Sequence, residues 1–91
     1  MAKSKALPVR IVILQRGWVV VGRYAQSGSA VTITGASVIR RWGTTRGLGE
    51  IAAGGPTPNT ALDGCGTVRC HELAVIATLD CEAAKWATII K

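Results

Sequence analysis

Acidic residues are scarce in this chain of 91 residues: five Asp and Glu stand against eleven Lys and Arg, and Phe is absent altogether. Hydrophobic residues nevertheless make up 48% of the sequence, which excludes a disordered tail, and the eleven glycines exclude a coiled coil. A chain of this length forms one small domain that buries about two-thirds of its unfolded surface. A large enclosed active site is therefore not expected.

Long apolar runs are also missing. No stretch approaches the roughly 18 residues that cross a bilayer, and Pro8 and Arg10 interrupt the amino-terminal stretch before a secretory core can form. The three cysteines are unevenly spaced and cannot all pair within one chain, which favours a reducing compartment over a secreted disulfide framework. We expect a soluble cytoplasmic protein without a membrane partner.

Metal ligands and catalytic groups are few. The three cysteines and the single histidine would supply four zinc ligands by number, but Cys65 and Cys70 are wrongly spaced and no Cys-x-x-Cys or paired histidine occurs. With one histidine, nothing singles out a nucleophile and its base. We expect no metal, no cofactor, no catalytic residues and no enzymatic activity.

β-branched and aromatic residues dominate residues 9–24, whose sequence is VRIVILQRGWVVVGRY. This composition predicts strands, and the polar break at 15–17 predicts a tight turn between two strands or a bend within one. Small polar residues at 25–30 predict a hairpin turn, and alternation at 31–34 predicts a half-buried strand. In the extended pattern that follows, Ala36, Val38, Arg40 and Trp42 lie on one side, and Ser37, Ile39 and Arg41 on the other.

Residues 43–66 contain seven Gly and two Pro without sustained periodicity, which predicts a long loop with a short element at 48–53 within it. Residues 67–79 return to strand character, as two short strands or one bent strand. Beyond them, Asp80 is a candidate N-cap of a short terminal helix. The helical spacing rests on Ala83, Trp86, Ala87 and Ile90.

These elements predict a mainly β fold: a small, strongly bent antiparallel sheet or barrel with a long Gly/Pro loop and a short C-terminal helix. Residues 1–8 are expected to form a flexible basic arm and residues 9–91 a single β-rich domain. The unpaired edges of such a sheet favour a homo-oligomer that shares strands across subunits. Because other aromatics are scarce, Trp18 and Trp86 are interpreted as core or interface anchors.

The segment at residues 40–50, RRWGTTRGLGE, combines the groups of an anion site. Guanidinium groups bind phosphate oxygens in pairs, glycine lets backbone N–H groups approach, and an indole stacks on a base. The glycine spacing matches neither a Walker loop nor a dinucleotide fingerprint. The alternative is a core tryptophan with arginines that face solvent or a neighbouring subunit. The predicted ligand-binding residues are Arg40, Arg41, Trp42, Thr44, Thr45, Arg46, Gly47 and Gly49.

Two resemblances extend this prediction. The runs VRIVILQRGWVVVGRY, VTITGASVIRRWG and TVRCHELAVIATL together resemble the layout of Sm-like barrels over about half of the chain. That resemblance implies a ring that binds RNA on a basic pore or face. The chain departs from those proteins in its long Gly/Pro segment and in lacking a counterpart of their amino-terminal helix.

The second resemblance is to small bacteriophage-encoded proteins, and it spans about residues 17–86. It is carried by ASVIRRWGTTRGLGE, a following Gly-Pro-Thr loop, GTVR and a tryptophan near the end. It implies a viral origin, with the infected bacterial cell as location. Compact phage proteins with basic pockets commonly interfere with bacterial immunity, including by sequestering nucleotide signals.

By analogy with that class, we expect a non-catalytic homo-oligomer that captures a phosphate-bearing nucleotide ligand. An Sm-like RNA-binding ring and a structural oligomer without a small ligand are the two alternatives.

Overall fold

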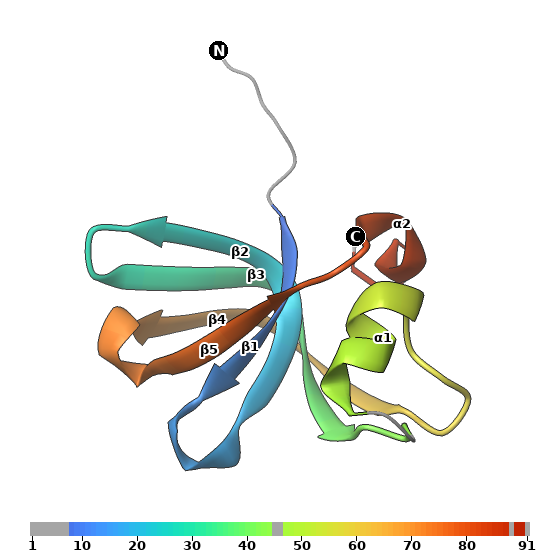
Figure 1. Cartoon of the computed structure of the whole chain (residues 1–91). Helices are drawn as coiled ribbons and strands as arrows, with labels where there is room; N and C mark the ends of the chain where they lie inside the picture. Colours follow the sequence, from blue (N-terminus) through green and yellow to red (C-terminus); the bar gives the residue numbers. More distant parts are fainter. Residues whose placement is uncertain (1–7, 45–46, 88, 91) are drawn as a thin grey trace.

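The computed structural model describes residues 8–44, 47–87 and 89–90, apart from the Arg16 side chain. Five antiparallel strands form one sheet in the order β4-β3-β2-β1-β5, and the sheet is not closed into a barrel (Figure 1). The prediction of a small, mainly β fold is confirmed. The strands are β1 (Val9–Leu14), β2 (Val19–Ser27), β3 (Ala30–Arg41), β4 (Ala61–His71) and β5 (Val75–Asp80).

The predicted turn at 15–17 lies where the sequence placed it, whereas the predicted turn at 25–30 is shorter, because β2 continues through Ser27 and β3 begins at Ala30. A single 3-10 turn, η1 (Gln15–Gly17), joins β1 to β2. Gly28 and Ser29 form the tight turn between β2 and β3, since Ser27 pairs with Ala30. The strands on either side of each break therefore pair as antiparallel neighbours.

The segment at residues 43–66 is not one long loop, and this part of the expectation is wrong. It contains α1 (Leu48–Gly54), at the interruption that the sequence indicated, and then the first six residues of β4. The glycine-rich start of β4 has little strand propensity of its own, but it pairs with the end of β3. Gly66, with φ of 77°, lies where the register between the two strands shifts. Pairing with a long neighbouring strand thus outweighs local composition.

The stretch at 67–79 is two strands rather than one. The 3-10 turn η2 (Glu72–Ala74) separates the end of β4 from β5. The expected terminal helix is present as α2 (Ala83–Trp86), but Asp80 is not its N-cap. Asp80 is the last residue of β5, and Glu82 occupies the N-cap position without a side-chain cap hydrogen bond.

One face of the sheet, here called the covered face, packs against α1 and α2, which lie together on one side in Figure 1. The Trp86 side chain is fully buried, and its indole Nε1 donates to the Ile51 carbonyl oxygen at 3.1 Å. The Glu82 amide donates to the Ala52 carbonyl at 2.9 Å, which fixes α2 against α1. Buried residues of this face are Val9, Ile11, Val19, Val21, Ile39, Leu48, Ile51, Ala52, Trp86 and Ile90.

The opposite face, here called the inner face, has no helix in its cluster. Its apolar side chains come from all five strands, so the sheet encloses them by curling on itself. As predicted for β3, Ala36 and Val38 lie on this face, while Ile39 lies on the covered face. Its buried members are Val12, Leu14, Val20, Val31, Ile33 and Ala36, bordered by Tyr24, Val38, Val68, Cys70 and Val75.

Within the described ranges, no helix is long and apolar enough to cross a membrane.

Candidate binding cavity

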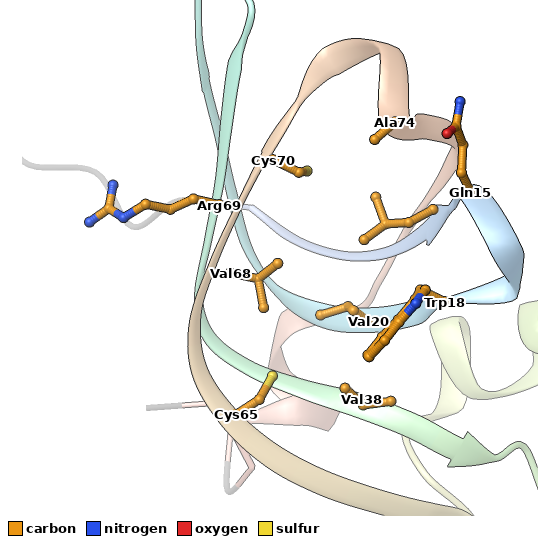
Figure 2. Close-up of a pocket in the computed structure, with 10 residues that line it drawn as sticks. Gln15, Trp18, Val20, Val38, Cys65, Val68, Arg69, Cys70 and Ala74 are labelled. Atoms are coloured by element: carbon orange, nitrogen blue, oxygen red, sulfur yellow. The ribbon is translucent and has the colours of Figure 1, made fainter.

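A cavity of about 380 Å³ opens on the inner face, between the beginning of β2 and the edge strand β4 (Figure 2). Its volume lies in the range of small-molecule sites, roughly 300 to 1,000 Å³. The open sheet leaves this space because no further strand or helix fills it. The lining residues are Leu14, Gln15, Trp18, Val20, Val38, Cys65, Val68, Arg69, Cys70 and Ala74.

Trp18 provides an aromatic surface at this cavity. Its side chain is 56% exposed, and Figure 2 shows the indole beside Val20 and Val38. The Gln15 Nε2 donates to the Leu73 carbonyl at 3.2 Å and joins η1 to η2 across the end of the sheet. An exposed indole above an aliphatic wall can stack with a flat ring and bury it at the same time.

The rest of the wall is apolar, with two thiols in it. The Cys65 Sγ donates to the Ala36 carbonyl at 3.4 Å, and burial raises the pKa of Cys70. Arg69 lines the cavity too, but its guanidinium points away from it in Figure 2. All three cysteines are free thiols. None of the described lining side chains therefore points a charge into the cavity, and a charged pair lies further along the inner face.

The charged pair consists of Arg40 and Asp63. The Arg40 Nε lies 2.8 Å from Asp63 Oδ2, and its Nη2 lies 3.4 Å from Oδ1. Asp63 lies opposite Val38 in the register of β3 and β4, and Val38 lines the cavity. The register shifts between Ile39 and Arg41, but the contact with Asp63 keeps the Arg40 side chain on the same face as Val38. Val20 pairs with Val38; Trp18 lies two residues before Val20, just ahead of β2, and Arg40 lies two residues after Val38 on β3.

The residues predicted to bind ligand do not form one cluster in the described part of the chain. Arg41 and Trp42 are exposed where β3 ends, with Trp42 43% exposed. The Thr44 Oγ1 accepts from the Gly47 amide at 3.1 Å and so stabilises the loop before α1. Gly49 lies in α1, with open space around it, and lines a separate hollow beside Glu50.

Thr45 and Arg46 lie outside the described residues. Arg40 is paired with Asp63, and this member of the predicted set is the one that borders the cavity face. Ligand binding by the others stays a prediction.

Hydrogen bonds from two threonines fix the chain after β3. The Thr60 Oγ1 donates to the Trp42 carbonyl at 2.7 Å, and the Thr57 Oγ1 donates to the Gly43 carbonyl at 2.7 Å. The Thr57 amide also donates to the Thr60 Oγ1 at 2.9 Å. The segment at residues 56–60 therefore holds the end of β3 in place.

The sequence did not identify Trp18 and the wall of β4 as neighbours. Trp18 was interpreted as a core or interface anchor, and Cys65 lay within the expected loop. A weak local signal existed, because Trp18 follows a polar turn and precedes a valine on the same face. Only the pairing of β3 with both β2 and β4 brings Trp18, Val38 and Cys65 together.

Among the residues that the structure describes, no group of three or more His, Cys, Asp or Glu side chains is arranged to hold a metal ion. No family model, curated protein or solved structure matches this chain.

Proposed function

We propose that this chain is a non-catalytic binding protein that captures a small phosphate-bearing ligand with a flat apolar part, of which a nucleotide is the fitting class. The observation that carries the proposal is the cavity beside the exposed Trp18, with Arg40 next on the same face. The base would enter the cavity and the phosphate would meet the guanidinium.

The cavity and Arg40 are chemically complementary to the two parts of such a ligand. The aliphatic wall and the indole favour burial and stacking of a base, but they offer no charge to a phosphate. Arg40 offers two N–H groups in one plane, which is the arrangement that binds phosphate oxygens in pairs. A ligand that spans both regions would bind more tightly than either part alone.

The charge of the whole chain supports the same class of ligand. The formal net charge is +6, and a positive field raises the local concentration of anions and their rate of encounter. The exposed Arg41 adds to that field near the end of β3. By analogy with compact phage proteins, the ligand would be a nucleotide signal of bacterial immunity, sequestered in the infected cell.

A homo-oligomer is part of the proposal, since β4 and β5 are the two edges of the sheet. Leu73 is 76% exposed beside β5, and Ile76 within it is 64% exposed. Unpaired edges with apolar side chains favour strand pairing between copies. These exposures also favour the second candidate function, a structural or interaction oligomer without a small ligand.

Isothermal titration with nucleoside monophosphates, cyclic dinucleotides, the matching nucleosides and inorganic phosphate tests the proposed function. At least one phosphorylated nucleoside is expected to bind with saturable stoichiometry, and Trp18→Ala should weaken it about tenfold, in line with a stacking contribution of roughly 1–3 kcal/mol per base. Trp42→Ala separates the cavity from the predicted segment at 40–50, because Trp42 is also exposed but does not line the cavity, and an equal or larger loss in that variant would place the base at Trp42 instead.

Single-stranded RNA of increasing length belongs in the same titration. Affinity that grows with strand length and falls steeply with salt would favour the Sm-like alternative instead. Absence of binding by the whole panel would leave the structural oligomer.

The oligomer has its own test. Light scattering after gel filtration is expected to give a mass above 9.5 kDa for the native chain and a smaller mass for Ile76→Lys. A native monomer would contradict this part of the proposal.

A further inference from the structure

The Arg40–Asp63 pair occupies the guanidinium edge that the proposed function assigns to a phosphate. The two contacts, 2.8 Å from Nε and 3.4 Å from Nη2, are those that a bound oxyanion would make. We propose that Asp63 is a built-in competitor of the ligand: binding exchanges the Asp63 carboxylate for a ligand phosphate on Arg40. This inference rests on the proposed function and names a residue that lowers the affinity of the site for anions.

Because the Arg40–Asp63 pair is exposed, such an exchange costs little free energy. The Arg40 side chain is 62% exposed and the Asp63 side chain 55%, so water already surrounds both charges. Ion pairs in this setting contribute little to stability, and their opening leaves no buried charge behind. The displaced carboxylate would be hydrated where it stands, at the outer edge of the sheet on β4.

The position of Asp63 relates the exchange to the cavity. Asp63 lies two residues before Cys65 on β4 and opposite Val38 on β3. Cys65 and Val38 both line the cavity. A ligand whose flat part lies against Val38 would therefore place its phosphate near Arg40, the partner of Asp63.

With this competition, a ligand binds tightly when it contacts both Arg40 and the cavity. A free phosphate contacts only the Arg40 guanidinium, and to do so it must displace the Asp63 carboxylate, which belongs to the same chain and is always close by. A nucleotide gains the burial of its base as well, and that contribution offsets the cost of displacement. Asp63 would thus lower the affinity for every anion by the same factor, and a nucleotide would still bind because its base adds contacts in the cavity that inorganic phosphate lacks.

The chain provides a matched control in a second arginine–aspartate pair. The Arg10 Nε lies 3.2 Å from Asp80 Oδ1, and its guanidinium carbon lies 5.1 Å from the Tyr24 ring centre. This pair also lies at an edge strand, but none of its residues lines the cavity. Asp63→Asn and Asp80→Asn remove the same charge from two different places.

The test compares these variants by isothermal titration against inorganic phosphate and the nucleotide that binds the native chain. Asp63→Asn is expected to tighten both ligands, by roughly two- to fivefold, the factor that corresponds to losing a competing exposed ion pair. Asp80→Asn should change the affinity less than that. Arg40→Ala should weaken the nucleotide, and adding Asp63→Asn to Arg40→Ala should have no further effect.

Each outcome has a definite meaning. Unchanged or weaker nucleotide binding by Asp63→Asn, with its circular dichroism intact, would overturn the exchange, since Asp63 would then be indifferent or would position Arg40. An equal gain in Asp80→Asn would assign the effect to net charge and would also overturn it. If neither the native chain nor Asp63→Asn binds any of the panel, the proposed function itself fails.

Discussion

The two apolar faces of this sheet differ in what covers them, and two tryptophans display the difference. On the covered face, Trp86 is fully buried between α1 and the sheet, and its N–H is satisfied by the Ile51 carbonyl. On the inner face, Trp18 is 56% exposed beside an open cavity. The same residue type thus stabilises the fold in one place and is available for a ligand in the other.

The two faces differ because different segments of the chain pack against them. Helices α1 and α2 supply Leu48, Ile51 and Trp86 to the covered face, which is therefore closed by additional elements. In the part of the chain that the structure describes, the inner face is closed by the curl of its own strands alone, and an open sheet closes incompletely. A small β domain can in this way hold a stable core and a usable cavity on opposite sides of one layer.

The largest expected effect would sharpen this contrast. Trp86→Ala should lower the free energy of unfolding by about 3–5 kcal/mol, since it removes a buried side chain and leaves a cavity. Trp18→Ala should change it by only about 0.5 kcal/mol, as for other exposed positions. Urea unfolding followed by circular dichroism measures both. Equal losses in the two variants would show that Trp18 is part of the core, and the contrast between the faces would fail.

A second prediction concerns the close approach of β2 and β3 beneath the inner face. A Cβ on Gly22 would lie 2.5 Å from Ile33 Cγ2 and 2.9 Å from the Thr34 carbonyl oxygen. Gly22→Ala should therefore cost about 1–3 kcal/mol of stability through overpacking. Gly64→Ala on β4 is the control, because nothing lies within 4 Å of the added carbon. Thermal unfolding at one pH compares them, and a tolerant Gly22 would indicate a looser inner face.

A third prediction concerns the threonine hydrogen bonds that fix the end of β3. Thr57→Val removes the donor to the Gly43 carbonyl and should cost about 1 kcal/mol. Amide hydrogen exchange at residues 42–44 should rise, because their opening no longer breaks that bond. Thr78→Val, at an exposed position of β5, serves as the control. No change in exchange would show that the segment is held by other contacts.

The smallest expected effect is a pH dependence of the free energy of unfolding, which arises from Cys81 on the covered face. Burial raises the pKa of Cys81 to about 11, above its ordinary value of 9.0. The unfolded chain therefore loses this proton at a lower pH than the folded one, so stability is fully present below about pH 9 and declines as the pH rises toward 11. Cys81→Ala should flatten the melting temperature over that range. A slope that persists in the variant would assign it to another group.

The elements that the sequence predicted well are those whose pattern is local. Alternation at 31–34 and the polar breaks at 15–17 and 25–30 specify strands and turns without reference to any other part of the chain. The first half of β4 escaped prediction because its glycines resemble a loop, and only the neighbouring β3 makes it a strand. The Asp80 N-cap failed for a similar reason, since pairing with β1 extends β5 through that residue.

The candidate site was harder to predict because it depends on register. The arginine-rich segment contains the groups of an anion site, but pairing with Asp63 across the sheet fixes what Arg40 faces. The cavity wall joins residues from β1, η1, β2, β3, β4 and η2 that no short motif contains. For its aromatic member, Trp18, the sequence carries only a weak local signal, and it does not show that Trp18 is exposed while Trp86 is buried.

The amino-acid sequence by itself determined the positive charge, the β character and the position of most turns, because these follow from composition and from periodicities a few residues long. The tertiary structure alone decided which face each helix covers, which arginine meets a carboxylate and where the sheet stays open. Those outcomes depend on contacts between residues far apart in the chain, and a strand pairing shifted by one residue would have reversed them.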